Sequence, residues 1–125
     1  MKELKWTPEH LEDLRYTGYA YLRQGKYDIA INFFEALTII DPESAYDAQT
    51  LGALYLQKGD PKAAIKWLDR ALKIETDHAP TLLNMCKALF MVGRKEEGLK
   101  LANILKKESN LAIANVATAL ILAHS

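Results

Sequence analysis

A repeat of 34 residues constrains this chain more than any other feature of its sequence. When the sequence is aligned with itself at a shift of 34 positions, small residues align with small residues at three positions. A fourth aligned position holds Phe34, Leu68 and Ala102. The matched sets are Gly18, Gly25, Ala30 and Phe34; Gly52, Gly59, Ala64 and Leu68; and Cys86, Gly93, Gly98 and Ala102. A repeat of this length is one supersecondary unit that buries its apolar face against neighbouring copies, and at least three copies are needed for stability. The sequence therefore predicts three stacked units.

The middle copy, residues 51–72, indicates what each unit contains. Apolar residues recur at helical spacing up to Gly59, and the pattern restarts after Asp60 and Pro61. A glycine of this kind ends a helix, an aspartate caps the next one, and proline is tolerated in the first turn. Each unit is therefore predicted to be a pair of antiparallel helices. No stretch alternates with period two, so strands are not expected.

The same signals predict an all-α fold for residues 1–125 as a single domain. Thr7 before Pro8 is typical of a helix start, and Ser109 or Asn110 can cap the last helix. The predicted elements are helical hairpins at about residues 8–40, 44–74 and 77–107, followed by a capping helix at 110–124.

Two repeated glycines fall in the middle of predicted helices. Gly18 and Gly52 each cost about 1 kcal/mol relative to alanine at such a position, so a packing gain must offset that cost. The expected gain is a close approach of the second helix of the hairpin, with Ala30 and Ala64 lying opposite the two glycines.

Composition excludes several classes of protein. Sixteen basic residues balance sixteen acidic ones, so the chain lacks the positive surface that nucleic-acid binding requires. The single cysteine, Cys86, keeps a small-residue pairing with Gly98 in the third unit, which favours a buried apolar role over a reactive thiol. No signal peptide is recognisable, which predicts a cytoplasmic location. The longest apolar segment, Leu111–Ala123, is shorter than the roughly 20 residues of a membrane span, so stable membrane insertion is not expected.

No pattern of catalytic or metal-ligating residues is recognisable. His10, His78 and His124 lie far apart in the sequence, without a second ligand at metal spacing. Phosphate-binding loops, nucleophile elbows and paired catalytic carboxylates are missing. We therefore expect neither an enzyme nor a metal or cofactor site.

The repeated residues also carry a family resemblance over residues 8–107. The matching positions are Leu14, Gly18, Tyr21, Ala30, Phe34 and Pro42 in the first unit, and Gly52, Tyr55, Ala64, Leu68 and Ala71 in the second. In these positions the chain resembles the tetratricopeptide repeat family. The resemblance implies a right-handed superhelix in which the first helix of each hairpin lines a concave groove that holds peptide.

A narrower resemblance begins at Phe33. The run from there to Ile65 is similar to the small tetratricopeptide chaperones of bacterial type III secretion systems, through Phe34, Ala36, Leu37, Asp41 and Pro42. It implies a bacterial, cytoplasmic chaperone that keeps a small secreted or export-apparatus protein soluble before export. The alternative is a general tetratricopeptide adaptor that joins folded proteins without a chaperone role.

The first helix of each hairpin carries a second stripe of residues beside the one that packs on its partner helix. This stripe is the predicted partner-binding groove, and it comprises Tyr16, Tyr19, Arg23, Tyr46, Gln49, Ala53, Leu56, Leu83, Lys87 and Phe90. Aromatic rings in a concave site give large contact areas and usually dominate binding energy. We expect a partner segment with apolar anchors, either an amphipathic helix or an extended peptide. The alternative is that Tyr16, Leu56 and Phe90 pack between neighbouring units.

A carboxylate clamp, which another class of tetratricopeptide proteins uses, is disfavoured. Such a clamp needs several cations that converge on one carboxylate. The corresponding positions here are Arg15, Tyr19, Thr50, Pro80 and Asn84, so most of the clamp is missing.

The last predicted helix, Leu111–His124, is apolar at eleven of its fourteen positions. A helix with so little polar surface is buried on more than one side. We expect contacts with Leu101 and Leu105 and with something further, either a second copy of the chain or the bound partner. The alternative is simple burial against the third hairpin, with alanines left exposed.

Overall fold

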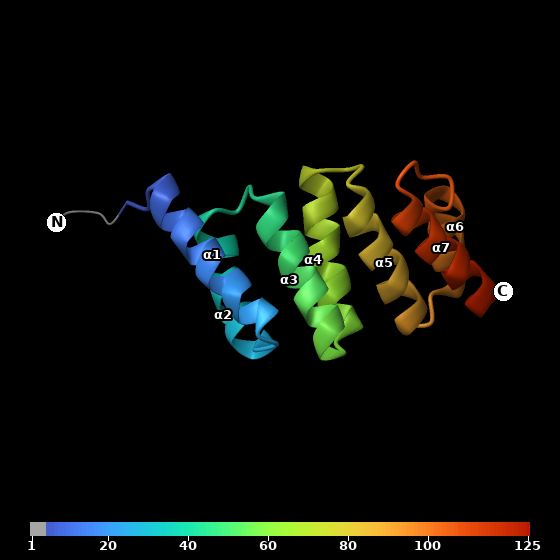
Figure 1. Ribbon diagram of the computed structural model, residues 1–125, viewed down its shortest axis with the longest axis horizontal. Coiled ribbons are helices and arrows are strands. Elements are labelled where there is room, and N and C mark those ends of the chain that lie inside the picture. The colour runs from blue at the N-terminus through green and yellow to red at the C-terminus, as the bar shows by residue number, and fades with distance from the viewer. Residues whose placement is uncertain (1–4) are drawn as a thin grey trace.

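The structure, a computed structural model, describes residues 5–125, so the first four residues of the predicted domain lie outside the described part. The described residues form seven helices and no strand. The helices are α1 (Pro8–Arg23), α2 (Tyr27–Ile40), α3 (Ala45–Lys58), α4 (Pro61–Ile74), α5 (Ala79–Met91), α6 (Lys95–Leu105) and α7 (Leu111–His124). They run from α1 and α2 at one end of the molecule to α6 and α7 at the other (Figure 1), which confirms the predicted all-α class with three hairpins and a last helix.

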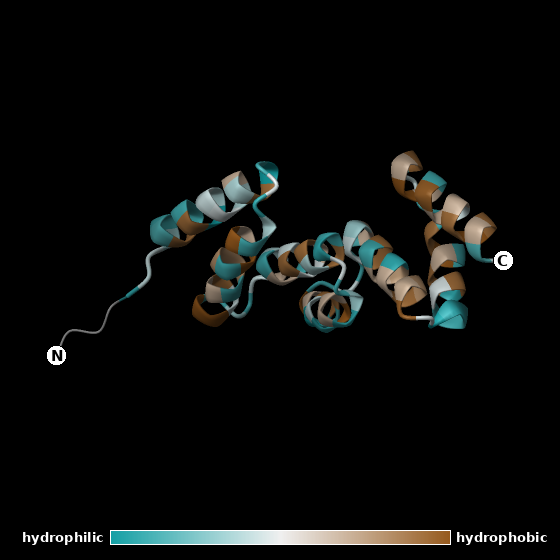
Figure 2. Cartoon of the chain, turned by 90° about the horizontal axis from the view of Figure 1, so that it is seen from below, coloured by the Kyte–Doolittle hydropathy of each residue, from teal (hydrophilic) through white to brown (hydrophobic). Residues whose placement is uncertain are grey.

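The row of helices is bent. Figure 2 shows α1 and α7 turning toward the same side at the two ends, with α4 on the outer side of the bend. Each hairpin turns at a glycine with positive φ, at 75° for Gly25, 87° for Gly59 and 82° for Gly93. Residues with a side chain rarely adopt this conformation, which explains why glycine recurs there at the repeat spacing.

Helix starts follow the predicted capping signals. The side chain of Thr7 accepts a hydrogen bond from the backbone N–H of His10, and Asp60 accepts one from Ala63, both at 3.2 Å. Asn110 caps α7 by accepting from the N–H groups of its first turn. The sixth helix ends at Leu105, two residues earlier than Lys107, because the chain tightens into i→i+3 hydrogen bonds there.

The mid-helix glycines allow the close approach that the sequence predicts, but the residues opposite them differ. A Cβ atom at Gly52 would lie 2.6 Å from Cγ and Cδ2 of Leu68, and one at Gly18 would lie 3.0 Å from Cβ of Phe33 and from the ring of Phe34. The nearest atoms to the two glycines belong to Phe33, Phe34 and Leu68 rather than to the predicted alanines. A large side chain fills each glycine gap, because it buries more apolar area than alanine would.

The third hairpin uses a variant of this contact. A Cβ atom at Gly98 would lie 2.8 Å from the Phe90 ring, and Cys86 donates its thiol to the Gly98 carbonyl oxygen at 3.3 Å. Cys86 is fully buried, and desolvation raises the pKa of its thiol to about 11. The neutral thiol is therefore the stable form, in agreement with the interpretation of this residue as a small apolar one.

The core consists of three apolar clusters along the row. One joins α1, α2 and α3 around Phe34, the next joins α4 and α5 around Leu68, and the last joins α5, α6 and α7 around Leu105. Tyr55 packs against the first two clusters and Leu101 against the last two. Tyr55 also donates its hydroxyl to the Glu35 carboxylate, which together with burial raises the pKa of Tyr55 to about 12.

The last helix closes the third hairpin. Ile113 and Ala117 are buried in one cluster with Leu105 and other residues of α5 and α6, and Leu101 packs against the same cluster. Leu111 and Leu122 remain 72% and 75% exposed. Figure 2 shows apolar residues along the whole length of α7. Within residues 5–125, no helix is both long and apolar enough to cross a bilayer.

The contact between Gly52 and Leu68 predicts a context-dependent effect of added volume. Gly52→Ala should lower the free energy of unfolding by about 1–2 kcal/mol. Overpacking against Leu68 costs about 1–3 kcal/mol, which exceeds the gain from the higher helix propensity of alanine. In a Leu68→Ala background the gap is open, and the same substitution should become neutral or stabilising. Urea denaturation of the four proteins measures this double-mutant cycle. An equal cost in both backgrounds would contradict the proposed contact.

Candidate functional site

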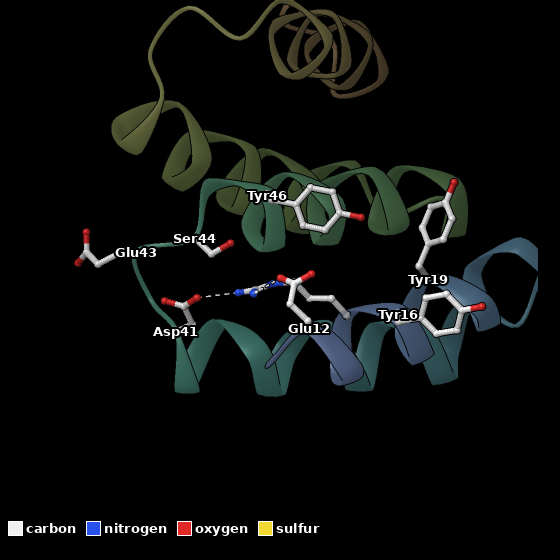
Figure 3. A pocket seen from close by; sticks show the side chains of 8 residues that line it. Glu12, Tyr16, Tyr19, Asp41, Glu43, Ser44 and Tyr46 are labelled. Atoms are coloured by element: carbon white, nitrogen blue, oxygen red, sulfur yellow. Dashed lines mark hydrogen bonds and ion pairs between the residues drawn. The ribbon is translucent and has the colours of Figure 1, made fainter. Parts of the chain in front are cut away.

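A cleft of about 630 Å³ lies between the first and second hairpins. Helix α1 contributes residues one helical turn apart, the loop between α2 and α3 contributes the edge, and α3 contributes its first turn (Figure 3). The lining residues are Glu12, Arg15, Tyr16, Tyr19, Asp41, Glu43, Ser44 and Tyr46. Three of the predicted groove residues therefore meet in one cleft, although they come from different repeats.

The three tyrosine rings of the cleft are accessible to solvent. Tyr16 is 78% exposed, and Tyr19 and Tyr46 are each 45% exposed. Tyr46 is held edge-on against the buried ring of Phe34, with the ring centroids 6.3 Å apart. The interpretation of Tyr16 as a residue packed between units does not hold, since most of its surface is open.

The base of the cleft is an ion-pair network centred on Arg15. Its Nε and Nη2 atoms donate to the two carboxylate oxygens of Asp47 at 2.8 and 2.7 Å, and Nη2 also donates to Asp41 at 2.6 Å. Glu12 accepts a longer bond from Nη1 at 3.2 Å. Hydrogen bonding to Asp47 is the main reason why the pKa of Arg15 lies above its usual value. The guanidinium is thus permanently charged and fully committed to carboxylates.

Asp47 explains why this network is rigid. It has no exposed side-chain surface, and it lies in the first turn of α3, where the Ser44 side chain accepts its backbone N–H at 3.2 Å. A carboxylate near a helix N-terminus is favoured by the helix dipole, and a bidentate arginine fixes its orientation. The pair therefore ties α1 to the start of α3 and sets the position of the tyrosines above it.

Four other predicted groove residues lie outside this cleft. Gln49 lines a separate cavity of about 90 Å³, near Tyr46 and the start of α5. Arg23 is exposed at the end of α1, and Ala53 and Lys87 are partly buried on α3 and α5. The predicted stripe is therefore divided: its N-terminal part forms a cleft, and the remainder does not join it.

The remaining three predicted residues serve packing. Leu83 was wrongly predicted to face a partner: it is only 9% exposed, because α7 covers this side of α5. Phe90 is stacked on the His124 ring with centroids 4.0 Å apart, and it also fills the gap at Gly98. Leu56 is partly buried against the cluster of α4 and α5. The alternative of packing between units therefore holds for Leu56, whereas Phe90 packs within its own hairpin and against α7.

Sequence reasoning missed the acidic loop residues of the cleft. Helical spacing does place Glu12 on the same face of α1 as Tyr16, since residues four apart lie on one helix face. Asp41 and Glu43 come from the loop between the hairpins. The loop residues gave no periodic signal. Their position depends on how α3 packs against α2.

The sequence matches a known protein family and one human protein. The sequence profile of a family described as anaphase-promoting complex, cyclosome, subunit 3 matches residues 27–105, more than half of the chain. The chain belongs to this family of tetratricopeptide repeat proteins. It is also 33% identical over 89 residues to the human protein O-mannosyl-transferase TMTC2. That match spans 67% of this chain but only 10% of the human protein.

Solved structures share the fold over almost the full chain. The Yersinia enterocolitica type III secretion chaperone SycD, in complex with a peptide of the translocator YopD, has a TM-score of 0.84 and 21% identity, with 94% of this chain and 93% of that chain covered. PcrH, a Pseudomonas aeruginosa protein solved with the chaperone-binding region of PopD, has a TM-score of 0.82 and 22% identity, covering 97% and 96%.

A third protein of similar structure is not described as a secretion protein. The first tetratricopeptide domain of Spaghetti (RPAP3), bound to an HSP90 peptide, has a TM-score of 0.83 and 20% identity, covering 97% of this chain and 98% of that one. At such identities the likeness concerns the fold. All three similar proteins are described in complex with a peptide or segment of another protein.

The Arg15 network predicts a large loss of stability when one partner is removed. Arg15→Met leaves the buried Asp47 carboxylate without a counter-ion, which should lower the free energy of unfolding by about 3–5 kcal/mol. Adding Asp47→Asn should restore part of this loss, because no buried charge remains. Glu12→Gln is the control and should change stability by less than about 0.5 kcal/mol, since Glu12 is 74% exposed. Urea denaturation at neutral pH measures each value, and equal effects of Arg15→Met and Glu12→Gln would refute the assignment.

Proposed function

We propose that this chain is a non-enzymatic, cytoplasmic chaperone of a bacterial type III secretion system, which binds a small secretion protein and keeps it soluble before export. The observation that carries the proposal is the cleft in which Tyr16, Tyr19 and Tyr46 expose their rings on a rigid base. The fold shared with SycD and PcrH supports the same role, since SycD is described with a peptide of the translocator YopD and PcrH with the chaperone-binding region of PopD.

The mechanism is burial of the client's apolar segment. Exposed apolar segments make a free protein aggregate, and covering them removes the surface through which copies associate. Tyrosine rings provide a large contact area with few rotatable bonds, so ordering them on binding costs little. Because Arg15 and Asp47 already fix α1 against α3, the cleft needs no rearrangement to receive the client.

The size of the cleft limits what it holds. A volume of about 630 Å³ accommodates a few side chains rather than a folded domain. The client therefore presents a short segment, either extended or as one face of an amphipathic helix. The rest of the client lies outside the cleft.

The second candidate is a general tetratricopeptide adaptor that joins proteins already folded. The match to a human protein and the fold shared with Spaghetti, described with an HSP90 peptide, favour this alternative. The two functions differ in the state of the client without its partner. A chaperone's client is insoluble alone, whereas the partner of an adaptor is soluble and folded.

The tyrosine cleft predicts which substitutions abolish chaperone activity. Co-expression with the secretion proteins of its own organism should give a soluble complex with one small protein that is insoluble when expressed alone. Tyr16→Ala and Tyr19→Ala should each weaken that complex about 30-fold, as removal of a central aromatic contact does. Binding is measured by titration of the purified client segment.

Ile39→Ala provides the matched control. Ile39 is 81% exposed on α2 and does not line the cleft, so its loss should leave affinity unchanged. A client that is equally soluble alone would favour the adaptor. A complex that is indifferent to both tyrosine substitutions would place the client elsewhere.

The exposed face of α7 is proposed as a second contact, with another copy of the chain or with the client. It displays Leu111 and Leu122, and Val116 is 37% exposed. Leu111→Glu together with Leu122→Glu should lower the mass of the dimer or client complex in light scattering. Unchanged masses would show that α7 serves only to complete the third hairpin. Point substitutions are preferred to deletion, since Ile113 and Ala117 belong to the core.

A further inference from the structure

The cleft between α1 and α3 is bordered by more carboxylates than cations. Arg15 is the only cation among the described residues that line it, and its guanidinium is shared by Asp47, Asp41 and Glu12. Glu12 is 74% exposed, Asp41 is 34% exposed and Glu43 is exposed. The rim therefore presents negative charge to any segment that enters.

The tyrosine rings lie near one of these carboxylates. Figure 3 shows the Glu12 side chain between Asp41 and Tyr16, with Tyr46 facing the same space from α3, whereas Glu43 lies at the far edge of the cleft. A tyrosine face attracts a lysine or arginine cation within about 6 Å of the ring centre. The same ring also packs against the aliphatic part of such a side chain. The tyrosine rings and the carboxylates therefore both favour a lysine or arginine side chain.

The distribution of charge along the chain strengthens this preference. Residues 5–60 contain nine acidic and five basic residues, whereas residues 61–125 contain six acidic and ten basic ones. The chain is neutral as a whole, but the half that holds the cleft is negative. A field of this sign draws a cationic segment toward the cleft and repels an anionic one.

We propose that the cleft selects a partner segment of net positive charge in which lysine or arginine flanks an apolar anchor. The anchor packs on Tyr16, Tyr19 and Tyr46, and the cationic groups reach Glu12 and Glu43. This inference rests on the proposed peptide-binding function and adds the charge of the peptide. It also sets this cleft apart from one suited to an acidic tail such as SRMEEVD, the HSP90 peptide described with Spaghetti.

The test selects ligands without assuming a client. A library of random short peptides displayed on phage is panned on the intact protein. Enriched peptides should carry lysine or arginine next to an aliphatic or aromatic residue, more often than the unselected library does. Peptide SRMEEVD should show no binding, because its three acidic residues outweigh its single arginine. Enriched sequences that are neutral or acidic, or binding of SRMEEVD as tight as that of the enriched peptides, would overturn the proposal.

Variants then locate the charge contact. Glu12→Gln together with Glu43→Gln should weaken the best peptide about tenfold in fluorescence anisotropy and reduce the salt dependence of its binding. The matched control, Asp77→Asn together with Glu96→Gln, changes the net charge equally at exposed positions outside the cleft and should leave affinity within about twofold. Equal losses in both pairs would overturn the local contact.

The charge preference and the chaperone role can fail independently of each other. A client complex that needs the tyrosines but tolerates Glu12→Gln and Glu43→Gln would refute the charge preference and leave the chaperone role standing. Selection of basic peptides without any insoluble client would refute the chaperone role and leave the charge preference standing.

Discussion

The close approach of helices at the repeated glycines is the constraint on which the rest of the structure depends. Leu68 occupies the space that a side chain at Gly52 would need, and the rings of Phe34 and Phe90 do the same at Gly18 and Gly98. A hairpin whose helices approach so closely is thin and rigid. Stacking such units in a row leaves their first helices free to present side chains on one face, which is where the tyrosines lie.

A second interaction gives the cleft its shape. Contacts within a hairpin are mainly apolar, but the junction between the first two hairpins also depends on Arg15 and Asp47, a pair in which the aspartate is fully buried. Such pairs gain little net stability, yet they tolerate only one geometry. The geometry of the junction therefore depends on the direction of the Arg15–Asp47 hydrogen bonds as well as on the buried apolar area. An apolar contact alone would leave the angle between α1 and α3 less defined, and with it the distance between their tyrosines.

The fold could be predicted closely from the sequence because its determinants are local. Glycines at turns, caps such as Asp60 and the 34-residue period all act within one unit. The site could be predicted only in part. Tyr16, Tyr19 and Tyr46 follow from helical spacing, but the burial of Leu83 depends on where α7 folds back, and spacing carries no information about that. The net charge of the whole chain is zero and so does not report that residues 5–60 carry a net negative charge and residues 61–125 a net positive one.

The division of the core into three clusters has a consequence for dynamics. Neighbouring clusters are connected through shared residues, Tyr55 between the first two and Leu101 between the last two. In such linear arrays each unit contributes its own stability and an interface with its neighbour, so terminal units open at a lower free energy than central ones. A ligand held between α1 and α3 bridges a terminal unit to a central one. Occupancy of the cleft therefore protects the first hairpin from local unfolding and from the proteases that act on open forms.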